Sequence, residues 1–176
     1  RPPDIKAAPG NADQPTMFRG GRNFELTLAD RDDPSRRAGL ITAAQADPGE
    51  SRTYIFQKPE VWWFARDGKA LRFRADRGQA YMPSEEKGSR PESGTFQDNV
   101  VFEMYACASG RIDDALKGPA LLTGTTTRIV YDGTLNEIDL PEPFEIQGDW
   151  GSCAGAGAVV IVNEMKQRLD RLRVEK

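Results

Sequence analysis

The chain is expected to be an all-β protein, and the clearest reason lies between residues 121 and 146. Over residues 121–131, β-branched and aromatic side chains recur at every second position, which is typical of a half-buried strand. Asp132-Gly133 then supplies a tight turn, and residues 138–140 form a short return strand. This stretch therefore predicts a hairpin with one long and one short strand.

Proline and glycine divide the chain into short elements. The 176 residues include 17 glycines and 12 prolines, while long apolar helical stripes are scarce. Pro141 and Pro143 end the return strand, because proline cannot donate a ladder hydrogen bond, and the alternation restarts at Phe144 and Ile146. The predicted unit is a long strand, a turn, a short strand, a proline break and a second short strand.

Similar units recur along the chain. Each has a long alternating strand, then a turn, then an apolar return strand. One such unit cannot bury its apolar face alone, so the units are expected to stack into one elongated antiparallel β structure. The four long strands are predicted at 40–47, 73–81, 125–132 and 156–164.

The other segments are assigned in the same way. The alternation predicts a first strand at 24–28 and a strand at 95–106 with a turn or bulge at Asp98-Asn99. Residues 166–176 have apolar positions at helical spacing as well, but the repeat favours a strand there. Two polar segments, 83–93 and 109–118, are predicted to be loops.

The most apolar segment, 53–65, contains two adjacent tryptophans. Pro59 divides this segment, and Trp62 and Trp63 then fall on opposite faces of one strand. They cannot both lie in one core layer. Either one of them lines a groove or a subunit contact, or the strand is covered on both sides.

Length and charge limit the function classes. A chain of this length forms about one domain, here expected at 17–176 after a flexible leader at 1–16. The net charge is −3 and the basic residues are scattered, so a nucleic-acid interface is not expected. No apolar run reaches the length of a membrane-spanning helix. Because the chain starts at Arg1, removal of a signal peptide or an N-terminal anchor is expected.

The residue types argue against an enzyme. The chain has no histidine, which excludes the usual Ser-His-Asp and Cys-His mechanisms and histidine-ligated metals. Residues 151–155 match the G-x-C-x-G form of a nucleophile elbow, but a strand follows instead of a helix. Gly155-x-Gly157 lacks the third glycine of a dinucleotide site. We expect no catalytic residue and no cofactor.

The two cysteines leave two alternatives open. Cys107 and Cys153 form one disulfide if the compartment is oxidising, or they remain unpaired, buried thiols. Two cysteines without histidine are too few for a structural zinc site, which needs four nitrogen or sulfur ligands. No metal site is expected.

The succession of motifs resembles the OstA-like family of lipopolysaccharide-transport proteins, closest to the LptC type and related to LptA. The resemblance covers most of the chain from about residue 24 to residue 174. The first matching segment combines LRFRADRGQAY at 71–81 with GTFQDNVVFEMY at 94–105. The others are LLTGTTTRIVYDGTLNEIDLPEPFEI at 121–146 and GAGAVVIVNEMKQRLDRLRV at 155–174. Two features depart from the family, namely the long polar loops and the missing N-terminal membrane helix.

The resemblance implies a periplasmic, elongated, open β-jellyroll shaped as a V-shaped trough. Members hold the acyl chains of lipopolysaccharide, or of a related envelope lipid, in the trough and pass them toward the outer membrane. The implied partners are other jellyroll transport proteins and an inner-membrane ABC transporter complex, contacted through edge strands. Attachment to the inner membrane would use an N-terminal segment that is absent from this chain.

The trough would need inward apolar side chains on successive strands. For each such residue, a place in an ordinary core is the alternative. The second hypothesis for function is a structural or carbohydrate-binding β-sandwich of the cell envelope, with Trp62, Trp63 and Trp150 as its exposed aromatics. The candidate lipid-binding residues are Leu71, Phe73, Val100, Phe102, Met104, Ile129, Tyr131, Phe144 and Ile146.

Overall fold

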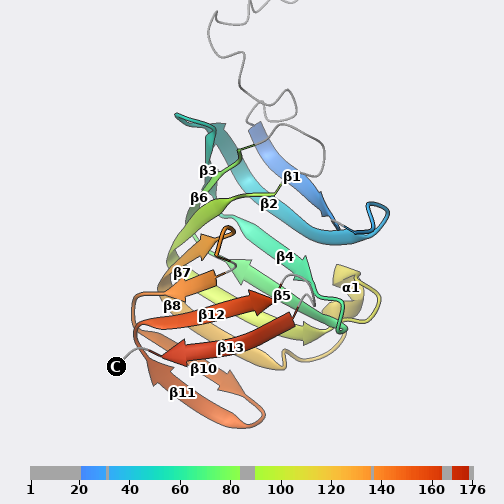
Figure 1. Ribbon diagram of the computed structural model, residues 1–176, viewed down its shortest axis with the longest axis vertical. Helices are drawn as coiled ribbons and strands as arrows, with labels where there is room; N and C mark the ends of the chain where they lie inside the picture. The colour runs from blue at the N-terminus through green and yellow to red at the C-terminus, as the bar shows by residue number, and fades with distance from the viewer. Residues whose placement is uncertain (1–20, 31, 84–89, 136, 164–167, 175–176) are drawn as a thin grey trace, which may run out of the picture.

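The computed structural model confirms an all-β protein (Figure 1). It contains a 13-stranded sheet, and within the described residues its only helix is a single short one. The predicted leader, most of the polar loop at 83–93 and part of the last segment lie outside the described residues. The structure describes residues 21–30, 32–83, 90–135, 137–163 and 168–174.

The strands follow one another with few other elements between them. The first seven are β1 (Gly21–Ala29), β2 (Arg37–Pro48), β3 (Thr53–Gln57), β4 (Glu60–Phe64), β5 (Lys69–Arg74), β6 (Arg77–Tyr81) and β7 (Ser93–Ala106). Helix α1 (Ile112–Ala115) comes next. The remaining six are β8 (Leu122–Asp132), β9 (Glu137–Leu140), β10 (Phe144–Gly148), β11 (Gly151–Gly155), β12 (Ala158–Asn163) and β13 (Arg168–Val174).

Three long strands organise the sheet, because each pairs along one side with two short strands. One half of β2 pairs with β4 and the other half with β3. Strand β7 pairs in the same way with β5 and β6, and β8 with β10 and β9. Pro59 separates β3 from β4, and two prolines separate β9 from β10. The predicted proline-divided return strands are therefore confirmed in both units.

The halves of the long strands define two arms of the sheet. The β4 arm contains β4, β5, β10 and β11, and the β3 arm contains β3, β6, β9, β12 and β13. Side chains from both arms enter one core cluster, which includes Phe144 of β10 and Leu140 of β9, and Phe73 of β5 packs against it. The sheet thus folds over, and the inner faces of the two arms meet.

A bulge bends β7 where the sequence predicted a turn or bulge. Asp98 and Asn99 have φ values of 64° and 49°, in the left-handed region that Asp and Asn tolerate better than most residues. The pairing with β8 moves from Gln97 opposite Arg128 to Val100 opposite Thr126. This irregularity separates the half of β7 that pairs with β6 from the half that pairs with β5.

Two local predictions need correction, and one segment without a predicted element, 151–155, is a strand. The single strand expected at 73–81 is two strands, because the chain breaks at Ala75 and Asp76, where the Asp76 amide donates to the Asp98 carbonyl at 2.9 Å. The expected loop at 109–118 contains α1. The small residues at 151–155 form β11, whose backbone pairs with β10. The last segment is confirmed as a strand, β13.

Two groups of strands lie at opposite ends of the sheet. Figure 1 shows β1, β2, β3 and β6 at one end and the β10–β11 hairpin at the other. Within the part of the chain that the structure describes, β1, β11 and β13 each pair with one neighbour only, so they are the edge strands. None of the described helices is long and apolar enough to cross a membrane.

Candidate functional site

A partly open apolar pocket of about 150 Å³ lies between the two arms. The β4 arm contributes residues of β4 and β5, and the β3 arm contributes residues of β3, β6 and β9. Apolar cavities of about this size stay dry and accept apolar ligands. The apolar residues of its wall include Leu28, Ile41, Phe56, Pro59, Val61, Trp63, Phe73, Ala80, Phe96, Ile129, Tyr131 and Ile138.

Strand register builds the wall on the β4 arm. Ile41 of β2 lies opposite Val61 of β4, which lies opposite Phe73 of β5, and Phe73 lies opposite Phe102 of β7. Residues directly opposite one another project from the same face of a sheet. The row of apolar side chains therefore crosses four strands on one face of the arm.

Glycine at position 124 allows this row to continue. Gly124 of β8 lies opposite Phe102, and a Cβ atom there would overlap the Phe102 ring. The ring therefore lies across the β8 backbone. On the far side of β8 the row continues with Ile146 and Cys153.

The structure brings some of the nine predicted lipid-binding residues together at this pocket. Phe73, Ile129 and Tyr131 line it. Four others belong to or pack against the adjoining core cluster, namely Val100, Phe102, Phe144 and Ile146. The last two, Leu71 and Met104, lie opposite each other on β5 and β7, in the neighbouring row with Trp63.

Sequence reasoning did not select most of the lining. Val61 and Ile138 alternate along their strands, so the same pattern that gave Phe73 could have identified them. Trp63 realises the alternative in which one of the two adjacent tryptophans lines a groove. Arg90 and Pro91 also line the pocket. They belong to a segment predicted to be a polar loop, and no local pattern indicates that they reach an apolar site.

The outer face of β4 is closed. Trp62 and Phe64 are each 1% exposed and pack with Tyr105 of β7 and Ala115 of α1. The Trp62 indole donates to Glu60 at 2.6 Å, and the Arg72 guanidinium lies 5.3 Å from the Trp62 ring centre. Burial, followed by the charge of Glu103, raises the pKa of Tyr105. Strand β4 is thus covered on its outer face, while Trp63 lines the pocket on the inner face.

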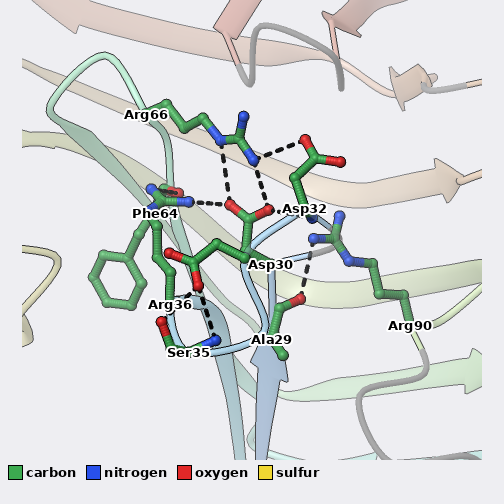
Figure 2. Close-up of polar contacts among 9 residues, drawn as sticks. Ala29, Asp30, Asp32, Ser35, Arg36, Phe64, Arg66 and Arg90 are labelled. Atoms are coloured by element: carbon green, nitrogen blue, oxygen red, sulfur yellow. Dashed lines mark hydrogen bonds and ion pairs between the residues drawn. The ribbon is translucent and has the colours of Figure 1, made fainter.

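A charged cluster fixes the end of β1 near the pocket (Figure 2). Asp30 has a fully buried side chain that accepts hydrogen bonds from Arg36 at 2.6 Å and from Arg66 at 2.7 Å. Arg36 also donates to the Phe64 carbonyl at 3.0 Å, and Arg66 donates to Asp32 at 2.9 Å. Hydrogen bonds with Asp30 and then Asp32 raise the pKa of Arg66. The cluster ties the β1–β2 connection to the end of β4.

Arg90 contacts the same end of β1. One of its terminal nitrogens donates to the Ala29 carbonyl at 3.3 Å (Figure 2). Its Nε is buried and has no hydrogen-bond partner. Arg90 therefore connects the segment between β6 and β7 to the end of β1 and also lines the pocket.

The two cysteines are free thiols, so the disulfide alternative is not realised in this structure. Cys107 belongs to the outer cluster with Trp62, and its thiol donates to the Arg111 carbonyl. Cys153 packs against the cluster between the arms instead. Among the residues that the structure describes, no three histidine, cysteine or acidic side chains group together as a metal site would require.

Comparison of the sequence with models of known protein families gives no match, and comparison with characterised proteins gives none. Conclusions about function therefore depend on the geometry of the pocket and on its chemistry.

Proposed function

We propose that this protein binds the acyl chains of lipopolysaccharide, or of a related envelope lipid, in the pocket between its two arms. In this proposal the folded sheet is an open β-jellyroll whose inner faces form a V-shaped trough. The protein acts in the periplasm without catalysing a reaction. It receives the lipid from one neighbour and passes it to the next, toward the outer membrane.

The observation that carries the proposal is an unfilled space with apolar walls inside a folded-over sheet. Protein interiors are normally close-packed, so a space bordered by Val61, Trp63 and Phe73 is unusual for a core. Each methylene group moved from water into such a space contributes about 0.8 kcal/mol. An acyl chain supplies many methylene groups and needs few polar contacts, which matches these walls.

The edge strands support the second part of the proposal. Strands β1 and β11 are the outermost strands at opposite ends of the β4 arm, and each leaves one side of its backbone unpaired among the described strands. An unpaired edge can accept a strand of another chain. End-to-end docking with other jellyroll proteins, and with an inner-membrane ABC transporter complex, would then extend the pocket into a continuous path.

The placement of the tryptophans favours a lipid over a carbohydrate. A sugar-binding surface needs exposed aromatic side chains, but Trp62 is 1% exposed and Trp63 lines the pocket. Trp150 is 60% exposed, and it lies at the β10–β11 turn. A carbohydrate-binding function, one form of the alternative as a structural or carbohydrate-binding module of the envelope, would thus depend on a single one of the three tryptophans.

The test is native mass spectrometry of the protein purified from Gram-negative cells, with and without added lipopolysaccharide or lipid A. We expect one lipid per chain in the wild type. Val61→Asp places a carboxylate in the half-buried wall of the pocket and should remove the adduct. Thr125→Asp, an exposed position on β8, is the matched control and should retain it.

Circular dichroism shows whether each variant is folded. The absence of a lipid adduct in the folded wild type under all conditions would contradict the proposal. Binding assays with glycans would then test the alternative. An adduct that persists in folded Val61→Asp would show that the lipid binds elsewhere.

A further inference from the structure

We infer that the pocket selects lipids with an anionic head group and that Arg90 binds this group. The inference rests on the proposed function, because it assigns the head group of a lipid whose acyl chain occupies the pocket. It concerns a part of the ligand that the apolar walls cannot recognise.

Arg90 differs in chemistry from the rest of the lining. Among the described residues that border the pocket, it is the only charged one. The other side chains there are apolar or aromatic, apart from that of Gln79. Arg90 lines the pocket and is itself only half-buried, so its charge lies where the polar end of an amphiphile could remain in contact with water.

The hydrogen bonds of Arg90 leave part of its guanidinium available. One terminal nitrogen donates to the Ala29 carbonyl at 3.3 Å, whereas the buried Nε has no partner. Buried donors are nearly always paired in folded proteins. A carboxylate or phosphate, with two oxygens in one plane, can accept hydrogen bonds from adjacent guanidinium N–H groups. Such a ligand would bind the terminal guanidinium N–H groups that the Ala29 carbonyl does not occupy.

The charges nearby do not neutralise Arg90. The acidic residues closest in sequence to its contact at Ala29 are Asp30 and Asp32, and they bind Arg36 and Arg66 (Figure 2). Arg90 forms no ion pair with any residue that the structure describes. The positive charge of Arg90 is therefore available to a ligand.

The experiment uses isothermal titration calorimetry on the full chain with three ligands that each have a single fourteen-carbon chain. These are tetradecanoate, tetradecyl phosphate and tetradecanol. The two anions are kept below their micelle concentrations and the alcohol below its solubility limit. Arg90→Met keeps much of the apolar stem of the side chain and removes the charge. Arg128→Met makes the same change at an exposed position of β8 and serves as the matched control.

We expect the wild type and Arg128→Met to bind at least one anionic ligand about 10- to 100-fold more tightly than the alcohol. Arg90→Met should lose this preference and keep the affinity for tetradecanol. Tighter binding of tetradecanoate would identify a carboxylate as the natural head group, and tighter binding of tetradecyl phosphate would identify a phosphate.

Two results would overturn the inference and leave the proposed function standing. One is equal affinity of the wild type for the alcohol and both anions. The other is a loss of tetradecanol binding in Arg90→Met together with a lower melting temperature, which would make Arg90 a structural residue. If the folded wild type binds none of the three ligands, the proposed function fails and the inference fails with it.

Discussion

The two faces of β4 carry similar side chains and are used differently. On the outer face, Trp62 and Phe64 are almost completely buried and pack with Tyr105 and with Ala115 of α1. On the inner face, Val61 and Trp63 are half-buried and border the pocket. One face of β4 thus belongs to a closely packed core, and the other face borders an open pocket.

This difference shows that the pocket does not result from a shortage of apolar side chains. The chain closes the outer face with a segment that includes a helix of four residues, and it leaves the inner face open. Side chains that pack densely contribute to stability, whereas those around a space contribute less, because they lack partners on one side. The two faces should therefore respond differently to the same substitution.

The largest effect is expected from Trp62→Ala. Removal of a fully buried indole leaves a cavity and should lower the free energy of unfolding by about 3–5 kcal/mol. Urea denaturation followed by circular dichroism measures this change. Trp150→Ala, at a position 60% exposed, is the control and should change stability by less than about 0.5 kcal/mol. A loss below about 1 kcal/mol in Trp62→Ala would show that the outer face is not the densely packed side.

A smaller effect is expected from Asp30→Asn. The substitution removes the negative charge that Arg36 and Arg66 share, and those two side chains are 30% and 36% exposed. Loss of one partner from a fully buried pair costs about 3–5 kcal/mol, and partial exposure of the arginines lowers the expected cost to about 2–3 kcal/mol. Thermal and urea denaturation measure it.

Asp33→Asn is the control for this change, because Asp33 is exposed and its hydrogen bonds come from Ser35 within the same turn. It should leave the unfolding midpoint almost unchanged. If Asp30→Asn behaves like this control, the charged cluster does not hold the β1–β2 connection against the end of β4.

The smallest change in stability is expected from Trp63→Ala, at about 1 kcal/mol, because this half-buried indole faces the pocket. The substitution should reduce the affinity for the ligand more than it reduces the stability of the fold. A bound ligand raises stability in proportion to ln(1 + [L]/Kd), so the rise in melting temperature on adding tetradecanoate should shrink in Trp63→Ala. An unchanged rise would remove Trp63 from the binding surface and would weaken the contrast between the two faces.

Sequence patterns predict the parts of this fold that are determined locally. The alternation of apolar and polar residues identifies β1, β2, β7 and β8, since neighbouring residues of a strand face opposite sides. The backbone tolerance of Asp98-Asn99 predicts the bulge in β7. Pro59 marks the division of a return strand, because it lacks a backbone donor.

Features that depend on distant contacts could not be predicted in this way. The break between β5 and β6 contains neither proline nor glycine, and it depends on a hydrogen bond from the Asp76 amide to the Asp98 carbonyl on the neighbouring strand β7. Strand β11 has the composition of a loop and is held by backbone pairing to β10. Arg90 reaches the candidate site only because the chain returns past the end of β1.

The sharing of β2, β7 and β8 between the two arms has a consequence for folding. Neither arm has a complete set of strands without these three, so neither can exist as an independent unit. The sheet should therefore lose its structure in one cooperative transition, with the same midpoint for probes placed in either arm. Some paired strands are not neighbours in the sequence, such as β3 with β6 and β9 with β12. A slow folding reaction is therefore also expected.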